Sequence, residues 1–143
     1  MRKVLVIHGP NLNLLGRREP GIYGTVTLAE IDQQLRELAA ELALEVTTFQ
    51  SNSEGDIVTT IQQAVDWADA VIINAGAYTH TSLAIADALR AVKTLAIEVH
   101  LSNIFAREAV RQHSFLSPVC VGQICGFGAQ SYLLALRAVA GLV

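Results

Sequence analysis

The chain has 143 residues, of which 52% are hydrophobic and 16% charged, and its formal net charge is −3. This composition is too apolar for a disordered chain, and the length predicts a single domain over residues 1–143. No apolar run approaches the ~20 residues of a membrane-spanning helix. The apolar run at 4–7 is too short for a secretory signal, so we expect a cytoplasmic protein without a membrane partner.

The charged residues also argue against nucleic acid as a partner. A duplex-binding surface needs a basic patch, but the arginines group only as Arg17-Arg18 and as the pair Arg107 and Arg111. Such small groups suit a small anion better.

Two cysteines, Cys120 and Cys125, lie in one apolar run. If that run is a strand, their side chains point to opposite faces and cannot pair. Their spacing matches no metal motif, so we expect buried, reduced thiols and no metal site.

The first half of the chain alternates strand and helix signals. Residues 4–7 are apolar and β-branched, which predicts a strand buried on both faces. A loop rich in glycine follows at 9–24 and is long for a connection to a helix. Thr27 and Glu30 form a capping box for a helix over 28–42, and a second strand is predicted at 46–49.

The second half continues the alternation. A helix opened by Ser53 or Glu54 is predicted to reach Ala68, and a third strand covers 70–74. The remaining predicted elements are a helix from Thr81 or Ser82 to Arg90, a strand at 94–98, a loop with a short helix at 100–114, a strand at 119–125 and a helix at 130–139.

Strands that alternate with helices and are apolar on both faces indicate a parallel sheet covered on both sides. Five of them favour a flavodoxin-like α/β sandwich with strand order 2-1-3-4-5, which binds ligands at the carboxyl ends of its strands. Polar residues follow the first, third and fourth predicted strands at this edge. They include His8, Asn11, Arg18, Tyr23, Asn74, His80, Glu98, His100, Ser102, Arg107 and Arg111. Both lysines precede strands at the opposite edge, so neither is placed for a Schiff base.

The histidines have different expected roles. His8 ends a buried strand, which favours a structural role. His100 follows Glu98 by two residues, so both share a strand face and the carboxylate can orient the imidazole for acid–base chemistry. His80 is either a neutral hydrogen-bonding group at a helix start or an ordinary loop residue, and His113 is expected on the surface.

The other polar candidates have a plain structural alternative. Arg107 and Arg111 share one face if they lie on one short helix, and that face either binds an anion or is solvated beside Glu108. Tyr23 is either a packing anchor or, beside an arginine, a base with a lowered pKa. No nucleophile elbow, dinucleotide fingerprint or phosphate-binding loop is present, so we expect a site without a cofactor.

Five motifs in register closely resemble type II 3-dehydroquinate dehydratases over essentially the whole chain. They are GPNLNLLGRREP at 9–20 with Tyr23-Gly24, QSNSEG at 50–55, NAGAYTHTS at 74–82, EVHLSN at 98–103 and REAVR at 107–111. The resemblance implies loss of water from 3-dehydroquinate to 3-dehydroshikimate through an enolate, in the shikimate or quinate pathway.

The resemblance also implies roles for individual residues. Tyr23 is the base, kept ionised by Arg18; Asn11 stabilises the enolate through a water; His100 is the acid, aligned by Glu98. The remaining implied residues bind substrate or shape the lid over 9–24. They are Asn74, His80, Leu101, Ser102, Arg107 and Arg111, with Asp87 reaching the site of a neighbouring subunit in a homododecamer, a tetramer of trimers. The apolar surplus of the composition is compatible with such an assembly.

Two other classes of function remain open at this stage. One is a flavodoxin-like module that binds a nucleotide or small anion without chemistry, although no phosphate-binding glycine loop follows the first strand. The other is an interaction scaffold that has lost activity, against which the presence of Arg18, Tyr23 and His100 argues.

Overall fold

A parallel five-stranded sheet with the order β2-β1-β3-β4-β5 forms the centre of the computed structural model. The structure describes residues 1–17 and 19–143, without the side chains of Pro20 and Tyr23. The strands are β1 (Arg2–His8), β2 (Leu44–Gln50), β3 (Ala70–Asn74), β4 (Leu95–His100) and β5 (Gly122–Cys125). The predicted flavodoxin-like strand order is therefore confirmed.

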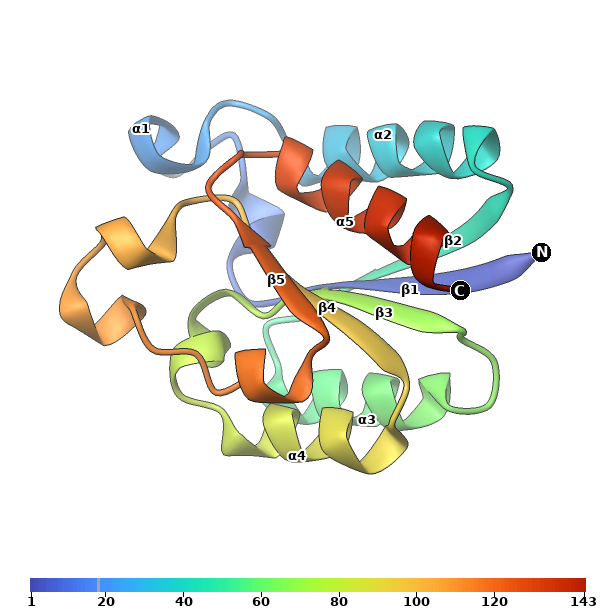
Figure 1. The fold of residues 1–143 in the computed structure, drawn as a ribbon. Helices are drawn as coiled ribbons and strands as arrows, with labels where there is room; N and C mark the ends of the chain where they lie inside the picture. The colour runs from blue at the N-terminus through green and yellow to red at the C-terminus, as the bar shows by residue number, and fades with distance from the viewer. Residues whose placement is uncertain (18) are drawn as a thin grey trace.

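Helices cover both faces of the sheet, with α2 (Leu28–Glu41) and α5 (Gln130–Leu142) on one face and α3 (Glu54–Ala64) and α4 (Leu83–Val92) on the other (Figure 1). Each face has its own apolar core, and alternate residues of the central strands point to the two cores. In β4, for example, Ile97 and Val99 face α2 and α5, whereas Ala96 faces α3 and α4. Glu98 and His100 alternate with the same period and share the face of Ala96.

Helix starts follow the predicted caps. Thr27 Oγ1 accepts the Glu30 N–H at 3.2 Å, and Ser53 and Ser82 cap α3 and α4 in the same way. The predicted extension of α3 to Ala68 is wrong: the helix ends at Ala64, and residues 65–67 turn back toward β3.

The connection before the fifth strand differs from the prediction. The fifth strand starts at Gly122 rather than at 119, because a 3₁₀ turn, η5 (Ser117–Val119), contains Pro118, which has no N–H for a sheet ladder. Cys120 therefore lies before the strand; Cys120 and Cys125 are both free and half-buried rather than fully buried. Burial raises the pKa of the Cys120 thiol to about 12, so this thiol stays protonated.

The segments at the carboxyl edge of the sheet are built from short turns. The loop at 9–24 contains η1 (Leu12–Leu14) and α1 (Pro20–Tyr23). The segment after β4 contains η3 (Ile104–Ala106) and η4 (Ala109–Arg111). The prediction that Arg107 and Arg111 lie on one short helix is therefore wrong, because Arg107 follows η3 and Arg111 ends η4. These segments lie together at the edge opposite the N-terminus (Figure 1).

Candidate active site

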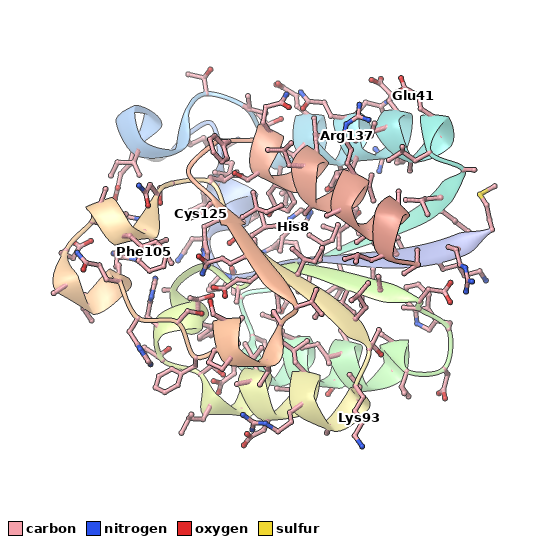
Figure 2. The ribbon with its side chains drawn as sticks, in the orientation of Figure 1. His8, Glu41, Lys93, Phe105, Cys125 and Arg137 are labelled. Atoms are coloured by element: carbon pink, nitrogen blue, oxygen red, sulfur yellow. The ribbon has the colours of Figure 1, made fainter. Side chains whose placement is uncertain are left out.

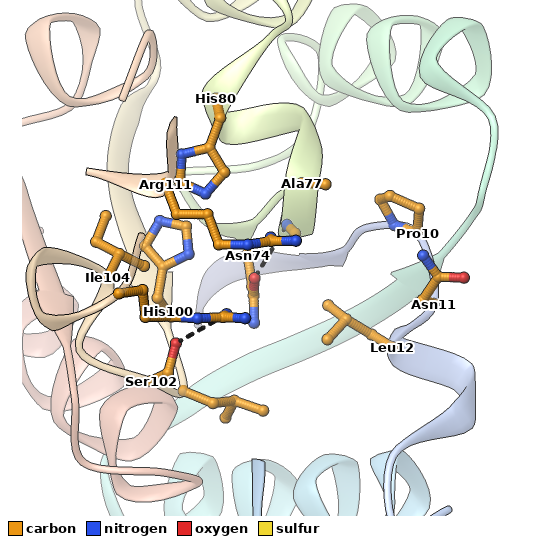
Figure 3. A pocket seen from close by; sticks show the side chains of 13 residues that line it. Pro10, Asn11, Leu12, Asn74, Ala77, His80, His100, Ser102, Ile104 and Arg111 are labelled. Atoms are coloured by element: carbon orange, nitrogen blue, oxygen red, sulfur yellow. Dashed lines mark hydrogen bonds between the residues drawn. The ribbon is translucent and has the colours of Figure 1, made fainter. Parts of the chain in front are cut away.

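A cavity of about 110 Å³ opens at the carboxyl ends of β1, β3 and β4. The side chains of Asn74, His80, His100, Ser102 and Arg111 converge on it from different segments, opposite Pro10, Asn11 and Leu12 (Figure 3). The residues that line it are Pro10, Asn11, Leu12, Asn74, Gly76, Ala77, His80, His100, Leu101, Ser102, Ile104, Arg107 and Arg111. Eight of the twelve predicted site residues are therefore brought together here.

Glu98 and His100 form a buried pair at the floor of this cavity. Glu98 Oε2 lies 2.5 Å from His100 Nε2, and the Glu98 side chain has no exposed surface. The predicted contact between these two β4 residues is confirmed. Because Nε2 is bound to the carboxylate, Nδ1 is the ring nitrogen left for other partners.

Hydroxyl groups surround the Glu98 carboxylate. Ser117 Oγ donates to Oε1 at 2.6 Å, Ser114 Oγ contacts both oxygens at 2.8 and 2.9 Å, and Thr79 Oγ1 donates to Oε2 at 3.3 Å. Burial alone would raise the pKa of Glu98, but the hydrogen bonds from His100, Ser117 and Ser114, with the charge of His100, lower it to about 2. Glu98 is therefore a fixed anion beneath the cavity.

The sequence did not predict that Thr79, Ser114 and Ser117 would bind Glu98. Ser114 and Ser117 lie 16 and 19 residues from Glu98 along the chain, so no local spacing links them to it. The one available signal is the cluster of polar residues directly after the fourth strand and before the fifth.

His80 ends η2 (Gly76–His80) and lies beside His100, with ring centroids 6.3 Å apart. His80 Nδ1 donates to the backbone carbonyl of His113 at 2.8 Å, which leaves Nε2 as an acceptor in the neutral ring. Burial, with the charges of His100 and Arg111, lowers the pKa of His80, while the His113 carbonyl opposes this shift. His113 itself is exposed, as expected.

Two arginines bring positive charge to the cavity from the segment after β4. Arg111 Nε lies 2.9 Å from Glu108 Oε1, and Arg107 Nε lies 3.7 Å from the same oxygen. Although Arg111 Nε is close to Glu108 Oε1, the contact does not have hydrogen-bond geometry. The buried Nε therefore forms an ion pair but has no hydrogen-bond partner among the described residues. Arg107 also donates to Ser102 Oγ at 3.5 Å (Figure 3). The carboxylate of Glu108 that these contacts share is 61% exposed, so both guanidinium groups lie beside an acid that is largely hydrated.

Asn11 stands at the opposite wall of the cavity with a left-handed backbone, φ 69°. Its N–H donates to Asn52 Oδ1 at 3.0 Å, and Gln50 Nε2 donates to the neighbouring Gly9 carbonyl at 3.2 Å. The loop after β2 thus anchors the start of the segment at 9–24. A Cβ atom at Gly9 would lie 2.4 Å from the Ala75 carbonyl oxygen, so only glycine fits between β1 and β3 here.

The remaining predicted residues lie elsewhere or outside the description. Arg18 lies outside the described residues, as does the side chain of Tyr23, whose backbone ends α1. Asp87 does not line the cavity; its side chain is 70% exposed on α4 and binds Arg90 at 2.8 Å. Neither lysine is near the cavity, since Lys3 lies at the start of β1 and Lys93 caps the end of α4 (Figure 2).

Among the described residues, no group of three histidine, cysteine or acidic side chains could hold a metal ion. In that same part of the chain no helix is both long and apolar enough to cross a membrane.

The protein is therefore of the doubly wound α/β class, with a carboxylate-backed histidine and two arginines at the carboxyl edge of its sheet. The model of the family described as dehydroquinase class II matches residues 2–140. The chain therefore belongs to the class II dehydroquinase family.

Relatives and solved structures agree with this assignment. The chain is 60% identical to a 3-dehydroquinate dehydratase of Acaryochloris marina over 94% of this chain and 91% of that protein. It is 57% identical to a 3-dehydroquinate dehydratase of Pelotomaculum thermopropionicum over 98% of this chain and 97% of that protein. The crystal structure of a type II dehydroquinase from Butyrivibrio crossotus superposes with a TM-score of 0.95 at 45% identity, over 96% of this chain and 97% of that one.

Proposed function

We propose that this protein is a 3-dehydroquinate dehydratase, which eliminates water from 3-dehydroquinate to give 3-dehydroshikimate in the shikimate pathway. The observation that carries the proposal is the buried Glu98–His100 pair at the floor of a cavity lined by Arg107 and Arg111. It supplies a proton donor next to a binding site for an anionic, hydroxylated substrate. Membership of the class II dehydroquinase family supports the same reaction.

The elimination begins with loss of a proton from C2, next to the ketone. In our proposal the Tyr23 phenolate takes this proton, and the positive charge of Arg18 keeps the phenol ionised. The electrons of the C–H bond move toward the ketone and form an enolate, whose negative charge requires a hydrogen-bond donor. Asn11 supplies that donor through an ordered water.

His100 completes the reaction at C1. The enolate collapses to the conjugated ketone as the C1–O bond breaks, and His100 gives its proton to the departing hydroxyl, which leaves as water. Since Nε2 is held by Glu98, Nδ1 delivers this proton. The buried negative charge of Glu98 stabilises the imidazolium form that must precede this step.

The other residues around the cavity bind substrate. Arg111 pairs with the substrate carboxylate: its guanidinium lines the cavity, and its partner Glu108 is exposed, so the ion pair between them competes only weakly. The amide, ring nitrogen and hydroxyl groups of Asn74, His80 and Ser102, with the backbone of Leu101, bind the substrate hydroxyls. Arg107 shapes the side of the cavity that faces the proposed lid over 9–24, which would close to exclude water.

We also propose that the chain works as a cytoplasmic homododecamer, a tetramer of trimers, built from single-domain subunits. Asp87 would reach the site of a neighbouring subunit, which is compatible with its exposure on α4. Light scattering coupled to gel filtration tests this assembly, because twelve 15.4 kDa subunits differ clearly in mass from a monomer or a trimer. A stable monomer with full activity would contradict the assembly and the role of Asp87.

The reaction itself is tested by a direct assay. The purified protein is mixed with 3-dehydroquinate, without metal or cofactor, and the ultraviolet absorbance of the conjugated product is followed. Activity that survives borohydride treatment in the presence of 3-dehydroquinate supports a route without an imine, whereas inactivation by that treatment, which traps a Schiff base as a stable amine, contradicts it. No product from folded protein would contradict the proposed function.

A further inference from the structure

The edge strand β5 brings a polar side chain to the buried Glu98–His100 pair, the acid pair of the proposed reaction (Figure 1). No described residue of β5 lines the cavity. Gln123 on β5 and Glu98 on β4 are register partners, however, so their side chains emerge on the same face of the sheet. Ser117 of the turn η5 links them, because its Oγ lies 2.9 Å from Gln123 Nε2 and 2.6 Å from Glu98 Oε1. Three polar groups from separate elements thus form a row that ends at the carboxylate of the acid pair.

The chemistry of these groups gives each hydrogen bond of the row one direction. Burial would raise the pKa of Glu98, but the contacts with His100, Ser117 and Ser114 bring it to about 2, so Glu98 is ionised. A carboxylate only accepts, so the single Ser117 proton is donated to Glu98 Oε1. Ser117 Oγ then has only lone pairs left, and only the N–H end of the Gln123 amide can bind it.

The two oxygens of the Glu98 carboxylate have different partners. Oε2 lies 2.5 Å from His100 Nε2, whereas Ser117 Oγ contacts Oε1. Ser114 Oγ contacts both oxygens and is itself fixed, because it accepts the N–H groups of Leu116 and Ser117 at 3.1 and 3.0 Å. The last torsion of a glutamate side chain has only a weak preference of its own, so the hydrogen bonds decide how the carboxylate is turned. The Ser117 contact therefore opposes a rotation that would carry Oε2 away from the imidazole.

We infer that Ser117 and Gln123 are positioning residues for the acid pair. Gln123 holds the Ser117 hydroxyl in the rotamer that reaches Glu98, one of three staggered positions open to a serine. Ser117 in turn holds the carboxylate with Oε2 against His100. This inference rests on the proposed function, in which His100 is the acid. The acid pair is then in place before substrate binds, and the proton transfer needs no reorganisation of the carboxylate.

Removing either hydrogen bond should slow the reaction and leave binding unchanged. Ser117→Ala removes a bond to a charged group, so we expect kcat to fall about 10-fold. Gln123→Met removes a neutral bond at a similar side-chain length, so we expect a fall of about 3-fold. The Kd for quinate, a probe that lacks the ketone and cannot form the enolate, should stay at the wild-type value, because the described lining of the cavity includes neither side chain. A wild-type kcat in Ser117→Ala, or a change confined to KM and the quinate Kd, would overturn the inference.

Gln34→Met is the matched control for the glutamine. It makes the same change at another half-buried glutamine, which lies on α2 across the sheet from Glu98. Its kcat should equal that of the wild type. If it lowers kcat as much as Gln123→Met does, a general loss of packing accounts for the effect and the inference is overturned.

A double-mutant cycle tests whether the two residues act in series. In a Ser117→Ala background, Gln123→Met should have no further effect on kcat, because the hydroxyl that Gln123 holds is gone. An equal fall in both backgrounds would show that Gln123 acts by another route and would overturn the inference.

A crystal structure of the unliganded Gln123→Met protein gives a readout that needs no assay, and it replaces the cycle if Ser117→Ala does not fold. The Ser117 side chain should occupy more than one rotamer once the amide is removed. A single rotamer with the 2.6 Å contact to Glu98 unchanged would overturn the role of Gln123. Failure of the proposed function is distinguished by the wild-type protein alone, which would then form no product from 3-dehydroquinate whatever the variant structures show.

Discussion

Glu98 Oε2 and His100 Nε2 lie 2.5 Å apart in a site from which solvent is excluded on the Glu98 side. The two residues stand at i and i+2 of β4, so the strand itself sets their separation. The carboxylate is held from its other side by Ser114 and Ser117, which belong to the segment that follows the two arginines. His100 and the segment that carries Arg107 and Arg111 are therefore joined through a single buried charge.

Replacing Glu98 by Gln should slow the reaction without abolishing substrate binding. The amide keeps the size of the side chain but removes the negative charge that stabilises protonated His100. We expect kcat to fall by about 10²-fold, within the range of general acid–base catalysis, with little change in the Kd for quinate. Steady-state kinetics and calorimetric binding measure the two quantities. A wild-type kcat would contradict the role of this pair.

The same substitution should change how stability depends on pH. The folded-state pKa of Glu98, about 2, lies below its ordinary value of 4.5, so the ionised carboxylate stabilises the fold above pH 4.5. This stabilisation is lost as the pH falls from 4.5 toward 2, and amounts to about 3 kcal/mol.

Chemical denaturation at several pH values measures this effect. The difference in the free energy of unfolding between the wild type and Glu98→Gln should shrink by that amount over the interval. Glu45→Gln, at an exposed position of β2, is the control and should follow the wild type at every pH. A difference for Glu98→Gln that does not vary with pH would show that its charge is not the stabilising feature.

Arg111→Ala should weaken binding more than it slows chemistry. Arg111 is proposed to pair with the substrate carboxylate, and loss of a charged hydrogen bond corresponds to a rise in KM of about 10- to 100-fold. Arg111→Lys should recover only part of this loss, because the ammonium group cannot bind a carboxylate with two parallel bonds.

Arg137→Ala provides the comparison for this experiment. Arg137 is exposed on α5, away from the cavity, and its removal changes the net charge of the chain by the same amount (Figure 2). Its KM should equal that of the wild type. If both variants raise KM equally, general electrostatic attraction rather than a specific pair accounts for the effect.

The sequence predicted the fold well because the signals for it are local. Apolar runs such as 70–74 match their strands, and Thr27 caps α2 as its pattern indicates. The errors fall where local preference and tertiary geometry differ. Residues 119–121 have side chains that favour a strand, but Pro118 lies in the 3₁₀ turn η5, which extends to Val119. The strand β5 therefore begins only at Gly122.

The site was predictable where residues share an element or follow one. Glu98 and His100 are two residues apart, and the edge of a parallel sheet gathers the residues that follow its strands. The groups that hold Glu98 were not predictable, because Ser114 and Ser117 lie 16 and 19 residues from it along the chain. Only the folded chain brings them together.

The close approach of β1 and β3 at Gly9 leads to a prediction about the base of the proposed lid. Gly9 N–H donates to the Asn74 carbonyl at 2.7 Å, and a Cβ atom at this position would lie 2.4 Å from the Ala75 carbonyl oxygen. Both neighbours are backbone atoms, which cannot rotate away. Gly9→Ala should therefore separate the two strands and cost about 2 kcal/mol of stability, as overpacking does.

The displacement of the two strands should also slow the reaction, because Gly9 lies two residues before Asn11 and is hydrogen-bonded to Asn74. We expect folded Gly9→Ala protein to show both a lower kcat and a higher KM, measured at a temperature well below its unfolding midpoint. Gly141→Ala is the matched control: a Cβ there meets nothing within 4 Å, and alanine favours the helix α5. That variant should unfold at the same or a higher temperature with unchanged kinetics. Wild-type stability in Gly9→Ala would contradict the predicted overpacking, and wild-type kinetics in a destabilised variant would contradict the predicted displacement of Asn11 and Asn74.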